Sequence, residues 1–111
     1  MREHIKQYLK QYVEKFEALN IAGVEALILF GSQARDSATI SSDIDIAVVV
    51  SEPLDVRSRG LLRCLGDDIN PHIETNLFFT TPEALESPQH HFDTNTHIKR
   101  EGVALWGGLA T

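Results

Sequence analysis

Residues 26–50 read ALILFGSQARDSATISSDIDIAVVV. One apolar run leads into Gly31-Ser32, and a second follows Asp43 and Asp45. Each run has the length and composition of a buried β-strand. The sequence therefore predicts two strands, one bounded by a turn of phosphate-binding size and the other by a pair of carboxylates.

The two carboxylates are expected to share one face of the second strand. Side chains alternate along a strand, which places Asp43 and Asp45 on the same side with α-carbons about 6–7 Å apart. Ile44 and Ile46 then point into the core. Carboxylates this close repel each other unless a cation lies between them. Mg²⁺ suits such a pair, because it binds one or two carboxylates together with phosphate oxygens and water, and two such ions can assist an in-line displacement.

The glycine–serine turn offers the phosphate half of such a site. Gly31 permits a positive φ or a close approach of the backbone to a phosphate. The hydroxyl of Ser32 and the free N–H groups of the following turn can hold that phosphate. Arg35, one turn further on, is expected to contact phosphate or to pair with Asp36. Alone, either motif is most often a surface turn or a solvated strand end, but the two together favour a functional site.

A third acid is expected on the strand predicted at residues 72–79. Glu74 is the carboxylate inside that strand, and Asn76 lies on the same face. The apolar residues take the opposite, core-facing side: Ile73, Leu77 and Phe79. A third acid would orient or deprotonate an attacking hydroxyl.

The remaining sequence predicts helices and one further strand around this centre. An amphipathic helix is expected over 3–19, and another begins at Pro53 and ends before a loop at 66–71. The other expected elements are a helical turn at 81–83, a helix over 89–101 and a short strand over 103–106. This order predicts a layered α/β domain.

Size and composition limit the classes of function. The length of 111 residues indicates one domain. The net charge of −6 argues against long nucleic acid as an obligate ligand, because phosphate backbones are bound mainly through a positive surface. The sequence contains no signal-peptide pattern and no apolar run of about 18 residues, so we expect a cytoplasmic protein without a membrane span. The single cysteine, Cys64, is expected to be a core thiol.

The motif from Gly31-Ser32 to Asp43-Ile-Asp45 resembles the signature of the polymerase beta-like nucleotidyltransferase superfamily. The resemblance is greatest to the minimal nucleotidyltransferases of prokaryotes and covers about residues 24–106, including the ending 98–106. It implies one domain over 1–111, with an N-terminal helix at 1–20 and a nucleotidyltransferase core at 24–106. The implied fold is a small mixed sheet with helices mainly on one face.

The resemblance also implies roles for individual residues. Ser32 would hold the β- and γ-phosphates of a nucleoside triphosphate, with Gly31, Arg35 and Ser42 completing the nucleotide site. The implied magnesium ligands and catalytic acids are Asp43, Asp45 and Glu74. The chain departs from the family pattern twice: Asp36 stands where glycine is common, and Asn76 is the third-acid position if the strand register is shifted. In that case metal binding would survive while the chemistry weakened.

The family's partners suggest what this chain acts on. Minimal nucleotidyltransferases commonly work beside an all-helical HEPN or substrate-binding protein, and in toxin–antitoxin pairs they act as the antitoxin. The resemblance therefore implies transfer of AMP from ATP, with two Mg²⁺ ions, to a hydroxyl of such a partner. The alternatives are a catalytically weak antitoxin that acts by binding, and a small-molecule transferase of the aminoglycoside type. The sequence is also compatible with a homodimer of this chain.

A group of polar residues near the C-terminus offers an alternative interpretation as a zinc site. In a helix over 89–101, His90, Asp93 and His97 would share a face. A solvated polar face explains the same spacing, and we favour that interpretation.

Overall fold

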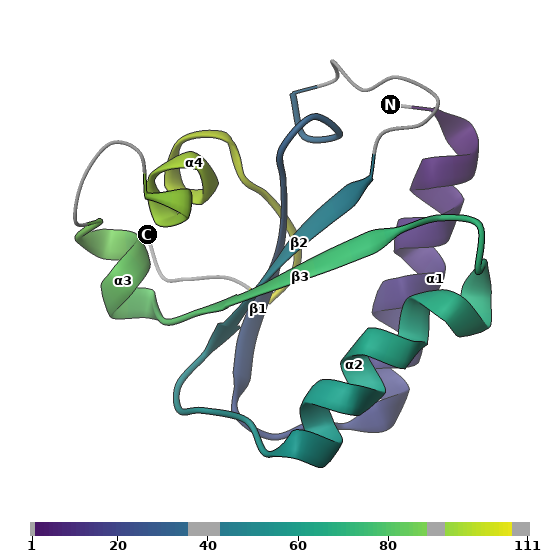
Figure 1. Cartoon of the computed structure of the whole chain (residues 1–111), viewed down its shortest axis with the longest axis horizontal. Helices are drawn as coiled ribbons and strands as arrows, with labels where there is room; N and C mark the ends of the chain where they lie inside the picture. The colour runs from purple at the N-terminus through teal and green to yellow at the C-terminus, as the bar shows by residue number, and fades with distance from the viewer. Residues whose placement is uncertain (1, 36–42, 89–92, 108–111) are drawn as a thin grey trace.

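The computed structural model describes residues 2–35, 43–88 and 93–107, and its centre is a four-stranded mixed sheet of order β3-β2-β1-β4 (Figure 1). β2 pairs with β1 antiparallel and with β3 parallel, while β4 pairs antiparallel with β1. The strands are β1 (Val24–Phe30), β2 (Ile44–Val50), β3 (Thr75–Thr80) and β4 (Val103–Gly107). The expected mixed sheet is confirmed, with β3 and β4 as its two edges.

Four helices lie on the two faces of the sheet. They are α1 (Glu3–Leu19), α2 (Val56–Ile69), α3 (Pro82–Glu86) and α4 (Thr94–Glu101). The long helices α1 and α2 cover one face, and the short helices α3 and α4 lie on the other (Figure 1). The helix expected over 3–19 is confirmed; of the helix expected over 89–101, residues 89–92 lie outside the described residues. Within the described part of the chain, none of the helices is both long and apolar enough to cross a membrane.

The core is built on both faces of β2. Ile44 and Ile46 are fully buried beneath α1 and α2, as predicted. Ala47 and Val49 are buried in a smaller cluster with Leu85 of α3 and Ile98 of α4. The strand alternation thus assigns Asp45 to the face that carries α3 and α4.

Aromatic residues attach α1 to the rest of the core. The Tyr12 hydroxyl donates a hydrogen bond of 3.1 Å to the Leu62 carbonyl of α2, and burial raises the pKa of that hydroxyl. The Phe16 ring meets the edge of Trp106 in β4, with ring centroids 4.8 Å apart. These contacts pack α1 against α2 and β4.

The third strand begins later than the sequence predicted. The Asn70 side chain accepts a hydrogen bond from the His72 N–H, and the Asn70 carbonyl accepts one from Ile73. These two bonds form a turn of the kind that asparagine favours. The turn occupies the first residues of the predicted segment, so β3 starts only at Thr75.

The helix α2 differs from its prediction at both ends. Asp55, not Pro53, precedes its first turn, and the Asp55 carboxylate accepts the Ser58 N–H at 2.7 Å. The helix continues through Gly66, where the sequence predicts the start of a loop. Gly66 is buried against the Tyr8 hydroxyl, and a side chain there would clash with it. This tertiary contact with α1 outweighs the low helix propensity of glycine.

The expectation of a core thiol is wrong. Cys64 is exposed on the outer side of α2. The buried residues of this helix are Leu62, Leu65 and Gly66. The 3.6-residue period turns Cys64 away from the core, even though its neighbours in sequence are apolar.

The cap of α2 predicts a pH dependence of stability. The Ser58 N–H holds the pKa of Asp55 below its ordinary value of 3.8, so the cap stabilises the fold above that pH and loses its effect as the pH falls below it. Asp55→Ala should lower the melting temperature at pH 7, and the difference from the parent should vanish on acidification. Thermal unfolding followed by circular dichroism measures both. Asp68→Ala, in the last turn of the same helix, is the control; an equal loss in that variant would contradict the assignment.

Candidate nucleotide-transfer site

The glycine–serine turn lies against one of the two carboxylates. The antiparallel pairing of β1 and β2 sets Phe30 opposite Asp45, and Gly31 follows at once. Gly31 has a φ of +77°, and a Cβ built there would lie 2.5 Å from Asp45 Oδ2. Both the backbone conformation and the lack of space require glycine. The motif's two halves, separated by ten residues in sequence, thus meet at this end of the sheet.

The turn after Gly31 is closed by its own backbone. The Arg35 N–H donates to the Gly31 carbonyl at 3.1 Å, which forms one helix-like turn. Ser32 is partly buried and Gln33 is buried within this turn. An N–H group at the start of such a turn is an anion-binding element in general.

The guanidinium of Arg35 has a partner that the sequence did not suggest. Arg35 Nη1 lies 2.7 Å from Glu101 Oε2, at the last residue of α4. The two residues are far apart in sequence, and no local pattern connects them. The alternative partner, Asp36, lies outside the described residues, as does Ser42 of the proposed nucleotide site. Contact of Arg35 and Ser42 with a nucleotide remains a prediction.

Asn76 bridges the two carboxylates. Its side-chain Nδ2 lies 3.3 Å from Asp43 Oδ2 and 3.3 Å from Asp45 Oδ1. The parallel pairing of β2 and β3 places Asn76 opposite Asp45, which explains the contact. The expectation that the two aspartates share a face is met. One amide donor that serves both of them offsets part of their repulsion.

Glu74 enters the site through its backbone. Its carbonyl accepts the Ile44 N–H at 2.9 Å, just before β3 begins, and its side chain is exposed. Among the residues that the structure describes, no three His, Cys, Asp or Glu side chains are grouped closely enough to hold a metal. The strand register sets Asn76, and not Glu74, opposite Asp45. A catalytic role for Glu74 remains a prediction.

The donor set fits magnesium rather than zinc. Asp43 and Asp45 supply hard carboxylate oxygens, both within reach of one Asn76 nitrogen. Mg²⁺ typically binds one or two carboxylates and completes its shell with phosphate and water, whereas zinc prefers histidine and cysteine. The missing Cβ of Gly31 lets the turn lie directly against the Asp45 carboxylate.

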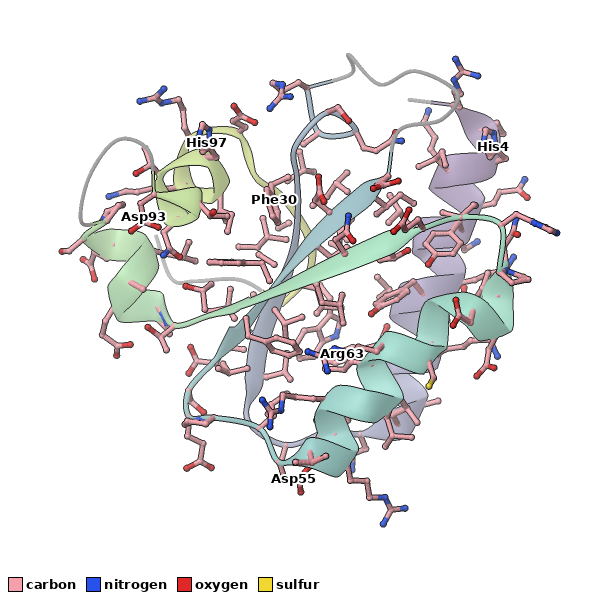
Figure 2. The ribbon with its side chains drawn as sticks, viewed as in Figure 1. His4, Phe30, Asp55, Arg63, Asp93 and His97 are labelled. Atoms are coloured by element: carbon pink, nitrogen blue, oxygen red, sulfur yellow. The ribbon has the colours of Figure 1, made fainter. Side chains whose placement is uncertain are left out.

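The histidine cluster considered for zinc is only partly within the described residues. Asp93 caps α4 by accepting the Asn95 N–H, and His97 Nδ1 lies 3.9 Å from Glu101 Oε1 (Figure 2). His90 and His91 lie outside the described residues. The structure therefore gives Asp93 a helix-capping role.

A polar cleft of about 620 Å³ opens beside the carboxylates. It runs along the outer edge of β3, and its polar lining includes Arg63, Asp67, His72, Glu74 and Asn76. Asn76 belongs both to this cleft and to the carboxylate pair. The cleft lies beside α2, and Asn76 connects it to the carboxylate pair.

Comparison with known families identifies the class of protein. The family model described as "Polymerase beta, Nucleotidyltransferase" matches residues 3–101. The chain therefore belongs to the polymerase beta nucleotidyltransferase family, as its signature indicated. No curated protein is similar enough in sequence to count as a match.

Solved structures of minimal nucleotidyltransferases share the fold. A chain from a crystal structure of a toxin–antitoxin with AMP-PNP is 26% identical, with a TM-score of 0.62, over 87% of this chain and 72% of that one. A chain from a toxin–antitoxin MntA–HepT structure is 25% identical, with a TM-score of 0.57, over 92% and 73%. A third, from a tri-AMPylated Shewanella oneidensis HEPN toxin in complex with MNT antitoxin, is 22% identical, with a TM-score of 0.55, over 92% and 72%, and shows the fold alone.

The contact between Gly31 and Asp45 leads to a stability prediction. Gly31→Ala should lower the free energy of unfolding by about 1–3 kcal/mol, because it adds a strained φ and a clash with the carboxylate. Gly60→Ala, in α2 with open space around its α-carbon, should raise it by about 0.5–1 kcal/mol. Urea denaturation of both variants measures the difference. Equal effects at the two positions would show that Gly31 is an ordinary turn residue.

Proposed function

We propose that this chain is a nucleotidyltransferase antitoxin that transfers AMP from Mg²⁺-ATP to a hydroxyl of a HEPN-type partner protein. The carrying observation is the Asp43–Asp45 pair, in which Asp45 packs directly against the Gly31 turn. Membership of the nucleotidyltransferase family supports the class of reaction. The similar toxin–antitoxin structure with AMP-PNP supports an adenine nucleotide, and the MntA–HepT structure supports a toxin as partner.

In this proposal the chain's residues hold the nucleotide for an in-line displacement. The acceptor oxygen bonds to the α-phosphorus while the bond from that phosphorus to the bridging oxygen breaks, and pyrophosphate leaves. Asp43 and Asp45 hold Mg²⁺, which neutralises the charge on the phosphates. Ser32 and the N–H groups of its turn bind the β- and γ-phosphates. Gly31, which has no Cβ, allows the phosphate-binding turn to lie directly against Asp45.

The proton of the acceptor hydroxyl must also be accepted. Asn76 has no basic group, because its side chain is an amide. Glu74 is the carboxylate nearest to it along the chain, and both line the polar cleft beside β3. We assign Glu74 the role of general base and Asn76 that of positioning the two aspartates. The acceptor would enter along the cleft.

A second candidate function is a binding-only antitoxin. The observation that favours it is Asn76, an amide that stands opposite Asp45 and is, with Glu74, one of the two residues that the resemblance offers for the third acid. If Glu74 does not act as a base, the site would retain the nucleotide but transfer AMP slowly. Neutralisation of the toxin would then depend on complex formation alone.

Transfer of label from α-labelled ATP to the product of the adjacent gene tests the proposal. Asp43→Asn/Asp45→Asn should abolish labelling while the chain stays folded. Glu74→Gln should lower the rate by about 10²–10⁴-fold, the usual contribution of a general base. Glu52→Gln, at the opposite end of β2 and exposed, is the matched control and should leave the rate unchanged.

The two candidates differ in the behaviour of Asn76→Asp. In the proposed transferase this variant should not raise the rate, since Glu74 already accepts the proton and the change removes the amide donor that serves both aspartates. A large gain in the rate of AMP transfer would mean that the parent chain lacks its general base. If the parent chain forms the complex with its partner but transfers no label, the binding-only antitoxin is favoured. If the folded Asp43→Asn/Asp45→Asn variant still transfers label, the assignment of these two aspartates as the metal ligands is refuted.

A further inference from the structure

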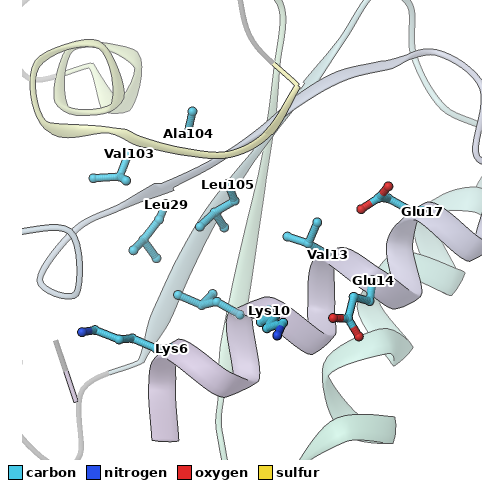
Figure 3. Close-up of a pocket in the computed structure, with 10 residues that line it drawn as sticks. Lys6, Lys10, Val13, Glu14, Glu17, Leu29, Val103, Ala104 and Leu105 are labelled. Carbon is cyan, nitrogen blue, oxygen red and sulfur yellow. The ribbon is translucent and has the colours of Figure 1, made fainter. Parts of the chain in front are cut away.

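An apolar groove lies on the side of the molecule away from the β3 cleft. It runs between α1 and the edge strand β4 and has a volume of about 500 Å³ (Figure 3). Its apolar lining comes from α1, β1 and β4: Leu9, Val13, Leu29, Val103, Ala104 and Leu105. Val103, which lines the groove, is 47% exposed. The groove therefore exposes apolar surface beside an unpaired strand edge.

Charged residues of α1 border the groove with a separation of sign. Lys6 and Lys10 lie towards the start of α1, and Glu14 and Glu17 towards its end (Figure 3). Spacings of three and four residues place all four on one face of the helix. They are exposed, and within the part of the chain that the structure describes none of them forms an ion pair. One end of the groove is thus positive and the other negative.

We propose that this groove is a self-association surface that binds a second copy of the same chain. In a symmetric dimer each surface meets itself, reversed by the two-fold axis. An antiparallel α1 from a second copy would set Lys6 opposite the partner subunit's Glu17 and Lys10 opposite the partner subunit's Glu14. One axis through the middle of α1 produces both pairings. This separation of charge is therefore self-complementary.

The edge of β4 fits the same two-fold axis. β4 lies at the end of the sheet next to α1, and its outer backbone groups face away from β1. A two-fold axis normal to the sheet sets the β4 edges of two copies antiparallel and the two α1 helices side by side on one face. An unpaired strand edge is a common template for such pairing. Val103 and Leu105 of each copy would then be covered by the other.

Charge reversal provides the test. Lys6→Glu/Lys10→Glu and Glu14→Lys/Glu17→Lys should each weaken the dimer by about tenfold or more, because every cross-subunit pairing becomes repulsive. An equimolar mixture of the two variants should dimerise again, and so should the chain that carries all four changes. Sedimentation equilibrium of the whole chain under reducing conditions measures the dissociation constants, since Cys64 is exposed and would otherwise cross-link copies.

The apolar part of the surface has its own variant. Val103→Lys should abolish the dimer, while Val56→Lys, 77% exposed at the start of α2, should leave it unchanged. A parent chain that stays monomeric at hundreds of micromolar would overturn the proposal, as would a dimer that is insensitive to both charge reversals. If the parent chain is monomeric alone and the charge-reversal variants no longer bind the product of the adjacent gene, the groove is instead the binding surface for that product. These outcomes do not depend on nucleotide transfer, so they are independent of the proposed function.

Discussion

The pairing of β2 with strands on both sides is the constraint on which the structure depends. β2 is antiparallel to β1 and parallel to β3, and its residues from Ile46 to Val50 are buried on both faces. Because side chains alternate with a period of two, a slip of one residue in either pairing would exchange the side chains that pack under α1 and α2 with those that pack under α3 and α4. The hydrophobic core therefore fixes both registers. Those registers in turn decide which residues meet at the start of β2.

The functional site is a consequence of these two registers. The pairing with β1 sets the Gly31 turn beside Asp45, and the pairing with β3 sets Asn76 opposite the same residue. Two carboxylates are thereby held together next to a backbone turn that only glycine can form. The energy of core packing is large enough to keep like charges close, a position that they would not adopt alone. Among the described residues, β3 and β4 form the two edges of the sheet. The β3 edge is polar and borders the carboxylates, whereas the β4 edge is apolar and borders α1.

Much of this fold could be predicted from the local pattern of the sequence. The periods of apolar residues located α1, β1 and β2 closely, and strand alternation placed Asp43 and Asp45 together. The errors arose where tertiary contacts outweigh local preference. Gly66 lies inside a helix because Tyr8 packs on it, and β3 starts late because Asn70 forms a turn. A single sequence contains no direct information about contacts between distant segments. Such contacts decide the choice between Glu74 and Asn76. They also decide the pairing of Arg35 with Glu101.

The central claim is that Asp43, Asp45 and the Gly31 turn form one nucleotide–metal site. A crystal structure with Mn²⁺ in place of Mg²⁺ and a non-hydrolysable ATP analogue, with the anomalous signal of manganese, tests it most directly. The account predicts an anomalous peak about 2.1 Å from carboxylate oxygens of both aspartates, with the phosphates of the analogue on the Ser32 turn. A metal bound elsewhere, or an analogue whose phosphates lie away from Gly31 and Ser32, would contradict it.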